Sequence, residues 1–444
     1  MLKIDEAWFE AYKNCTRHLP QTFAALEPTP SELTLLWQEF KHSNFSANLS
    51  LYPNKNVQTG LKKTLEDLDE LRRQIYERET NTLVKEQYVA AINETSLNIQ
   101  LICAAAQRND VEYARLNKQL YGQPKQEIFA ASCAFIHSTL DEHVSQPTHI
   151  GELARRVAAL LPKAELKSSN VALLPSEDVF SQVKALHYQP GGYFDTLFDG
   201  EMPDSAYVNQ REGDEWCQKS LHAIGAKNYI IKDSPTVTWA VDTEAEIVYR
   251  PVGYRLSRDD FIGIVAHEIG SHILEAVNGA RSPLKLLGSG LAGYLNGNEG
   301  RALVREQIVY PSCAVAARQL PWEYNILKHL SVCLALSYAG PCTFSQLYLT
   351  LKALFHFWRE RRHPLETNNE EVATEQAWYL AVRIMKGTNG LGGCYVKDIV
   401  YLEANIALWQ IAKTKPEHIL YGDNGKFNVL NKNQCAAVER LIAS

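Results

Sequence analysis

The residues with the clearest chemical potential lie in one short stretch, His267-Glu268-Ile269-Gly270-Ser271-His272. Two neutral imidazoles and a carboxylate are what a catalytic zinc ion needs if its fourth coordination position is to stay open for water. In the common protease motif His-Glu-x-x-His, the two histidines lie four residues apart and share one helical face with the glutamate. The stretch therefore indicates a zinc site.

The spacing of the two histidines does not fit a regular helix. His267 and His272 lie five residues apart, and at about 100° per residue this spacing turns one ring roughly 140° away from the other. A single-turn π-bulge absorbs one extra residue, and such bulges cluster at functional sites. Gly270 lies between the histidines, where a backbone distortion costs least. We therefore predict a bulged or underwound helix here; the alternative for these six residues alone is an ordinary buried helix with two hydrogen-bonded core histidines.

A third ligand is expected on another helix, a few tens of residues downstream. Glu299 is the leading candidate, because it lies 32 residues after His267 and follows Gly297-Asn298, which resembles a helix start. The competing interpretation is a surface acid that interacts with the dipole at a helix N-terminus. Glu306, seven residues later, is the fallback ligand.

The segments just before the histidine stretch predict a small sheet and a helix start. Alternating patterns rich in β-branched and aromatic residues predict three short strands, the last two paired antiparallel through a link of hairpin length, at 228–233, 236–241 and 246–250. Ser257 and Asp260 then predict a capping box that opens the histidine-bearing helix, which we expect to end at Asn278-Gly279. Many zinc proteases share this layout of a small sheet followed by a ligand-bearing helix.

The rest of the chain is predicted to be helical. Helices are expected to start near Thr29 and to span 59–77, 82–107, 124–144 and 148–161, and leucines 61, 65, 68 and 71 give the second of these one apolar face. After about Pro321 a capping box at 367–370 predicts a helix that runs to Lys386-Gly387, and the glycine-rich loop 387–393 is expected to line a pocket. The predicted fold class is α+β and mostly α-helical, with regions 1–165, 166–320 and 321–444 in one compact unit.

The composition argues against several classes of function. The chain has 444 residues and a formal net charge of −6, with its lysines and arginines spread along the sequence, so we expect neither a nucleic-acid nor a membrane partner. The N-terminus lacks the pattern of a signal peptide, and no apolar run reaches the 18 or so residues of a membrane helix. Nine cysteines without a Cys-x-x-Cys pair indicate reduced core thiols in a cytoplasmic protein.

Several further motifs resemble those of the QEGLA-motif proteins. The bacterial members of this family have been called flavohaemoglobin-expression-modulating proteins, and the animal members are the microtubule-associated tyrosine carboxypeptidases. The resemblance covers most of the chain after about residue 110 and depends, besides the histidine stretch, on Asn278-Gly279, Leu286-Leu287, Gly290-Leu291-Ala292-Gly293-Tyr294, Asn298-Glu299-Gly300-Arg301-Ala302, Leu120-Tyr121-Gly122-Gln123-Pro124, Arg383 with Lys386-Gly387, and the stretch from Tyr395 to Leu402.

The resemblance implies one zinc ion per chain, held by His267, His272 and Glu299, with Glu268 as the catalytic base. It also implies a gluzincin-like metallopeptidase core with a small antiparallel or mixed β-sheet, wrapped by N- and C-terminal helices. Motif and context together are much more specific than the six residues alone.

Three positions depart from the pattern of the family. Asn298 stands where Gln or Glu is usual, Ser271 where threonine is usual, and Arg301 where leucine is usual. A guanidinium at position 301 would either bind a substrate carboxylate or point to solvent.

These features predict a zinc metallopeptidase, and specifically a carboxypeptidase that releases a C-terminal residue from a peptide or protein tail. By analogy with the animal members, the released residue would be aromatic. Zinc polarises the peptide carbonyl and acidifies its bound water, and Glu268 takes the proton of that water and returns it to the leaving amine. The alternative is a regulatory or binding protein with a vestigial or structural metal site, which four protein ligands would close.

A carboxypeptidase also needs groups that hold the substrate. Arg383 and Lys397 are the first candidates for the cation that binds the free carboxylate, and Arg301 is the third. Tyr401 or Tyr294 would donate to the developing oxyanion; the alternative for each is a core aromatic with its hydroxyl hydrogen-bonded. The sequence leaves the oligomeric state open.

Overall fold

The computed structural model describes residues 4–162, 171–234 and 238–443. The structure is 66% helical, with one two-stranded and one three-stranded sheet, which confirms the expected mostly helical α+β class. All nine cysteines are free, and seven of them are buried. None of the described helices is long and apolar enough to cross a membrane.

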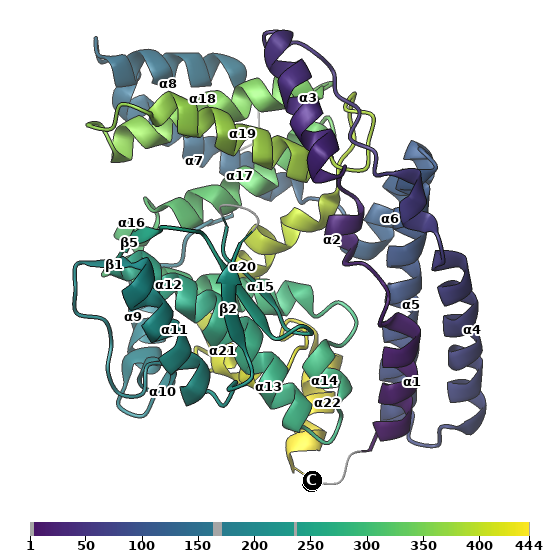
Figure 1. Ribbon diagram of the computed structural model, residues 1–444. Coiled ribbons are helices and arrows are strands. Elements are labelled where there is room, and N and C mark those ends of the chain that lie inside the picture. The colour runs from purple at the N-terminus through teal and green to yellow at the C-terminus, as the bar shows by residue number, and fades with distance from the viewer. Residues whose placement is uncertain (1–3, 163–170, 235–237, 444) are drawn as a thin grey trace.

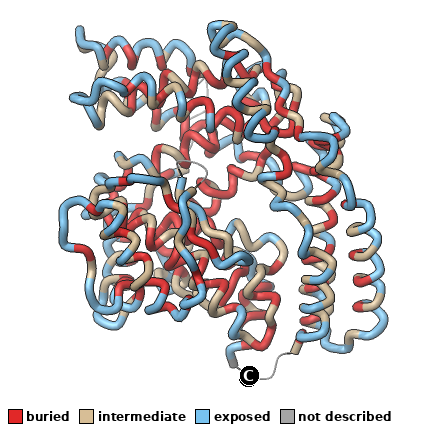
Figure 2. Tube along the Cα trace, viewed as in Figure 1, coloured by how far each residue is buried: buried red, intermediate tan, exposed pale blue. Residues whose placement is uncertain are grey.

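The N-terminal part is entirely helical. Its elements are α1 (Glu6–Thr16), α2 (Thr22–Ala25), α3 (Pro30–His42), η1 (Lys55–Gln58), α4 (Leu61–Arg78), α5 (Thr82–Ala106), α6 (Asp110–Tyr121), α7 (Gln126–Val144) and α8 (His149–Leu160). The helices predicted in this part are confirmed to within two residues at most boundaries. The apolar face of α4 is confirmed as well, since Leu61, Leu68 and Leu71 are buried while its outer side faces solvent (Figure 2).

The middle of the chain carries both sheets. Its elements are α9 (Glu177–Tyr188), α10 (Tyr193–Leu197), β1 (Tyr207–Asn209), α11 (Gln210–Ala223), β2 (Ile230–Asp233), β3 (Ala240–Asp242), β4 (Ile247–Arg250), β5 (Arg255–Ser257), α12 (Arg258–His267), the π-helical turn η2 (Glu268–Ile273), α13 (Leu274–Arg281), α14 (Leu286–Ser289), α15 (Leu295–Gln307) and α16 (Cys313–Ala316). The ligand-bearing helix thus ends at Arg281, two residues later than expected.

The three predicted strands form one mixed sheet of order β2-β4-β3. β3 and β4 pair antiparallel as predicted, and β2 pairs parallel with β4. The first residues of the second predicted strand, 236 and 237, lie outside the described residues. A second, two-stranded sheet of β1 and β5 was not predicted, because three-residue strands carry too little alternation to be recognised.

The C-terminal part returns to helices. Its elements are α17 (Leu320–Ala335), α18 (Phe344–Arg362), α19 (Asn369–Met385), η3 (Val396–Asp398), α20 (Ile399–Ala412), α21 (His418–Tyr421), η4 (Gly422–Asn424) and α22 (Lys432–Ala443). The predicted helix after residue 367 is confirmed as α19, but the capping box is not. The N-cap is Asn368, whose side chain makes no capping hydrogen bond.

The three regions expected from the sequence are interleaved in space. Helices α7 and α8 of the N-terminal region pack on α17 and α18 of the C-terminal region in one helical layer above the middle region, whereas α20 packs on α15 within the middle region (Figure 1). Helices α1, α4 and α5 form a separate group at one side (Figure 1). The boundary at 165/166 lies outside the described residues. The chain start is tied to the middle region, because the Asp5 carboxylate accepts hydrogen bonds from the backbone N–H groups of Lys285 and Leu286 at 2.9 and 3.1 Å.

Candidate metal centre

The histidine stretch lies on one continuous helix whose middle turn is widened. α12 leads without a break into the π-helical turn Glu268–Ile273, and α13 follows. This confirms the prediction that the helix is bulged between the two histidines. One extra residue in a turn brings positions five apart onto one face, and the ring centroids of His267 and His272 accordingly lie 5.0 Å apart.

The helix begins at the predicted N-cap, Ser257, but the reciprocal bond from the Ser257 backbone N–H that would complete the predicted capping box is not among its hydrogen bonds. The Ser257 side chain accepts a hydrogen bond from the backbone N–H of Asp260 at 3.2 Å, and its hydroxyl donates to the Asp260 carboxylate at 2.7 Å. A satisfied N-cap fixes where the helix begins. It therefore also fixes the register in which the two histidines are presented.

Three side chains, two of them from outside the turn, donate hydrogen bonds to carbonyl groups in and just before the widened segment. The carbonyl oxygen of Ala266 accepts from the Tyr193 hydroxyl at 3.0 Å and from the Ser271 hydroxyl at 2.9 Å. The carbonyl oxygen of Gly270 accepts from the Arg305 guanidinium at 2.9 Å. Buried carbonyls need partners, so these three side chains stabilise a turn geometry that a regular helix does not have.

Gly270 has a steric role that the sequence did not show. A Cβ atom at this position would lie 2.0 Å from the Tyr193 hydroxyl oxygen and 2.8 Å from Leu197 Cδ2. Its φ is not in the left-handed region. Gly270 thus lies in the distorted turn, as expected, and also permits the close approach of Tyr193.

The three predicted ligands converge. The ligand atoms of His267, His272 and Glu299 all lie within 4.8 Å of one another, and Nε2 of each imidazole lies 3.7 Å from Glu299 Oε2. A tetrahedral zinc ion with bonds of about 2.0–2.1 Å holds neighbouring ligand atoms about 3.3 Å apart. A shift of a few tenths of an ångström in each histidine–carboxylate distance would therefore suit the ion.

The donor set also leaves an unsatisfied atom that a cation would satisfy. Glu299 Oε2 is buried and has no hydrogen-bond partner. A buried carboxylate oxygen without a partner is costly. The residues present therefore fit a divalent metal ion with two imidazole ligands and one carboxylate ligand.

Glu299 is not the surface acid at a helix N-terminus that sequence spacing left open. α15 begins at Leu295, two residues before the expected start, so Glu299 lies beyond its first turn. Its side chain is 9% exposed. The pKa of this carboxyl is held well below its ordinary value, because the two nearby imidazoles and Lys397 outweigh the effect of burial.

Glu306 supports a ligand instead of serving as one. Its Oε2 lies 3.0 Å from Nδ1 of His267, and a proton on Nδ1 leaves Nε2 free as a metal donor. Burial by itself would lower the pKa of His267, but Glu299 and Glu306 hold it well above the ordinary value. Burial lowers the pKa of His272 to about 3, so that this ring is neutral. Binding of a metal ion would therefore release one proton from His267, because only the neutral ring can be a ligand.

Glu268, the predicted base, lies beside the first ligand but belongs to no group of converging ligand atoms found among the described residues. Burial, together with the negative charges of Glu299 and Glu306, raises its pKa to about 7 against the opposing charge of His267. The Glu268 carboxylate thus interacts electrostatically with the ligands but is not one of them.

One of the three predicted cations lies beside a ligand, and the other two are paired with other carboxylates. Lys397 Nζ is 3.9 Å from Glu299 Oε1. Arg383 binds the Asp398 carboxylate through Nε at 2.5 Å and through a terminal nitrogen at 2.8 Å, so its planar group is already engaged by two hydrogen bonds. Arg301 is buried, and its guanidinium pairs with Glu275 and Asp423. Neither role expected for Arg301 is seen: it does not point to solvent, and its charge is neutralised within the core.

The two tyrosines both lie near Glu299. Burial and the charge of Glu299 raise the pKa of each hydroxyl, so both remain hydrogen-bond donors. Tyr401 also lies 3.5 Å from a terminal nitrogen of Arg383. The sequence missed one neighbour, Lys328 on α17, whose ammonium lies 3.7 Å from the centre of the Tyr401 ring. The signal was a lysine in the middle of a mostly apolar helix, directly before His329.

The glycine-rich loop lines a pocket, as expected. A cavity of about 490 Å³ lies between this loop and α6, lined among others by Tyr113, Lys118, Asn389 and Gly392. The three ligands do not line it. No protein-family model matches the chain, and comparisons with curated proteins and with solved structures gave no match.

Proposed function

We propose that this protein is a zinc-dependent metallopeptidase, and specifically a carboxypeptidase that releases a C-terminal residue from a peptide or protein tail. The observation that supports the proposal most strongly is the convergence of His267, His272 and Glu299 across a π-turn, with Glu268 beside the first ligand. The resemblance to the QEGLA-motif proteins, which includes these residues and further motifs, also supports it, and with it a gluzincin-like core.

A zinc ion bound to these residues would polarise the carbonyl of the scissile bond and increase the acidity of water. Two imidazole ligands and the Glu299 carboxylate would leave room for a non-protein ligand. Glu306 keeps the His267 ring in the orientation and tautomer that ligation requires. Among the described residues the group holds three protein ligands. A structural site would be closed by four, which favours the catalytic interpretation over a regulatory or binding protein.

Glu268 acts as the general base and acid. It accepts a proton from the attacking water and passes it to the leaving amine, which is the role of a carboxylate that is next to the metal ligands but is not one of them. Tyr401 and Tyr294, both near Glu299, are the candidates that donate a hydrogen bond to the developing oxyanion.

The carboxypeptidase form of the proposal needs a cation for the substrate carboxylate. Lys397 is the leading candidate, because its ammonium lies beside Glu299. Lys328 is a second, near Tyr401. Arg383 positions Tyr401 and Asp398 through the hydrogen bonds it already makes.

A matched pair of peptides tests this proposal. The zinc-loaded protein is incubated with a peptide library in two forms, one with free C-termini and one with C-terminal amides, and the products are identified by mass spectrometry. We expect loss of single C-terminal residues from the free acids and little cleavage of the amides, because the amides lack the carboxylate. Equal cleavage of both forms, or internal cuts, would contradict carboxypeptidase action. No cleavage of any peptide would contradict the metallopeptidase itself.

A further inference from the structure

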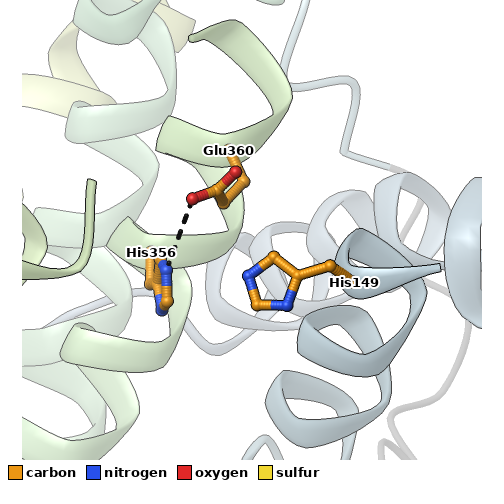
Figure 3. A group of neighbouring side chains, drawn as sticks. All are labelled: His149, His356 and Glu360. Atoms are coloured by element: carbon orange, nitrogen blue, oxygen red, sulfur yellow. Dashed lines mark ion pairs between the residues drawn. The ribbon is translucent and has the colours of Figure 1, made fainter. Parts of the chain in front are cut away.

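A second group of two histidines and one glutamate lies far from the first in the fold. His149 is the first residue of α8, and His356 and Glu360 lie on α18 (Figure 3). The ligand atoms of the three side chains lie within 4.8 Å of one another. We propose that these three residues form a second binding site for a divalent transition-metal ion such as Zn²⁺, which links α8 to α18.

Two of the ligands are prearranged by the helix that carries them. His356 and Glu360 are four residues apart, a spacing that places side chains on the same face of a regular helix. His356 Nε2 lies 3.6 Å from Glu360 Oε1, close to the separation of about 3.3 Å between neighbouring ligands of a tetrahedral zinc ion. No distortion of α18 is needed for this pair.

The third ligand comes from another helix, which distinguishes this group from an ordinary pair on a helix surface. The rings of His149 and His356 have centroids 5.8 Å apart, and His149 extends from the end of α8 toward the pair (Figure 3). The backbone at this point is held in place. The Thr148 side chain caps α8, and a Cβ on Gly151 would lie 2.1 Å from the carbonyl oxygen of Gln146.

The remaining distance can be closed by side-chain rotation. His149 is exposed, and exposed side chains exchange rotamers readily. Its ring can therefore approach the pair while the backbone of α8 stays in place. Because one ligand is exposed and the group has three, water would fill the other coordination positions.

The ligand types select the kind of ion. Two imidazoles with one carboxylate suit zinc and its neighbours in the first transition row, whereas magnesium and calcium prefer oxygen ligands. Lys352, one turn before His356 on α18, pairs with Glu370 at 2.9 Å, so its charge is already matched. A bound ion would hold the start of α8 against α18, two helices that pack together in the upper layer (Figure 1).

The test is the metal content of the full-length protein. Wild-type protein and variants are stripped with a chelator and dialysed to equilibrium against the same free Zn²⁺ concentration, and the protein-bound zinc is measured by elemental mass spectrometry against the dialysis buffer. His149→Ala and His356→Gln should each bind one equivalent fewer than wild type. The matched control is His222→Ala, an exposed helical histidine outside both groups, which should bind as much as wild type. Retention of the wild-type number of equivalents in both variants would overturn the proposal.

A local measurement separates this site from the proposed catalytic one. Zn²⁺ should slow amide hydrogen exchange in the first turns of α8 in wild-type protein and in His272→Ala, but not in His149→Ala. Since His149 is exposed, its replacement leaves the core intact even if His356→Gln fails to fold. Equal exchange at α8 with and without Zn²⁺ would also overturn the proposal, whatever the first site does.

Discussion

The two groups of two histidines and one glutamate differ in how the rest of the chain supports them. At His267, His272 and Glu299 the side chains are 9 to 14% exposed, and the Glu306 carboxylate orients one ring. At His149, His356 and Glu360 one ligand is exposed. Within the described ranges, no hydrogen bond orients either ring of that second group.

The two groups also differ in the backbone geometry that they require. The first group requires a π-turn, an unusual geometry that recurs at functional sites, and the side chains of Tyr193, Arg305 and Ser271 satisfy carbonyls in and just before it. The second group uses two regular helices as they are. A site for chemistry needs fixed ligands and an oriented tautomer, whereas a link between helices needs only ligands within reach. We therefore expect tight binding at the first group and weak, rapidly exchanging binding at the second.

The largest effect should come from a residue that has no counterpart in the second group. Glu268→Gln keeps the size of the side chain but removes the general base, so the rate of peptide cleavage should fall by about 10²–10⁴-fold. The zinc content should not change, because Glu268 is outside the ligand set. The measurement is kcat/KM on the best peptide, together with elemental analysis of the same preparation.

Glu371→Gln, an exposed acid on α19, is the control for this prediction. It should leave both quantities as in wild type. Full activity in Glu268→Gln would refute the assigned base, and loss of zinc in that variant would show that Glu268 is a ligand.

The next effect concerns the support of the first group. Glu306→Gln removes the carboxylate that lies 3.0 Å from His267 Nδ1, and loss of such an outer partner weakens metal binding by about 10–100-fold. Competition with a chromophoric chelator would measure this change. The equivalent assigned to His149 and His356 should be unaffected and provides an internal control. Unchanged zinc affinity would show that the ring needs no support from Glu306.

Much of this first group was predictable because its signals are local. The histidine spacing dictated a bulged helix as soon as both rings were assigned to one ion, and Ser257 with Asp260 dictated where that helix begins. The class of the fold followed from periodicity in the same way, since α4, α5, α7 and α8 carry long apolar patterns.

The features that could not be predicted from the sequence depend on contacts between residues far apart in the chain. Tyr193 and Arg305 donate hydrogen bonds to carbonyls of the widened helix that lie 73 and 35 residues away in the sequence. Arg301 is buried in an ion pair with Glu275. The second group was not predicted either, because His149 and His356 come together only through the packing of α8 on α18. Single residues carry no periodic signal, so sequence patterns cannot bring such partners together.

Alanine substitution of two glycines, one near each group, discriminates between the two groups. Gly270→Ala would place Cβ 2.0 Å from the Tyr193 hydroxyl, and Gly151→Ala would place it 2.1 Å from the Gln146 carbonyl oxygen. Overpacking of this kind costs about 1–3 kcal/mol of unfolding free energy. Gly270→Ala should weaken zinc binding only at the first group, and Gly151→Ala only at the second. Denaturant unfolding and metal titration of both variants measure the two effects.

The independence of the groups would be contradicted if either variant weakened metal binding at the other group or at both groups. Gly200→Ala is a less informative control, because that glycine has a left-handed φ of 77°. Ala280→Gly on α13, an exposed position near the first group, is a better one. It should cost about 0.5–1 kcal/mol through helix propensity alone and leave zinc binding unchanged.

The smallest effects should come from the two hydroxyls that share the Ala266 carbonyl. Tyr193→Phe and Ser271→Ala each remove one hydrogen bond and should each cost about 0.5–1.5 kcal/mol. Because either hydroxyl can partly serve the carbonyl when the other is absent, the double variant should cost more than the sum of the two single changes. Strict additivity would show that the hydroxyls act separately. The zinc affinity of the first group should fall only in the double variant, since the π-turn then loses both partners at Ala266, whereas the second group has no such turn to lose.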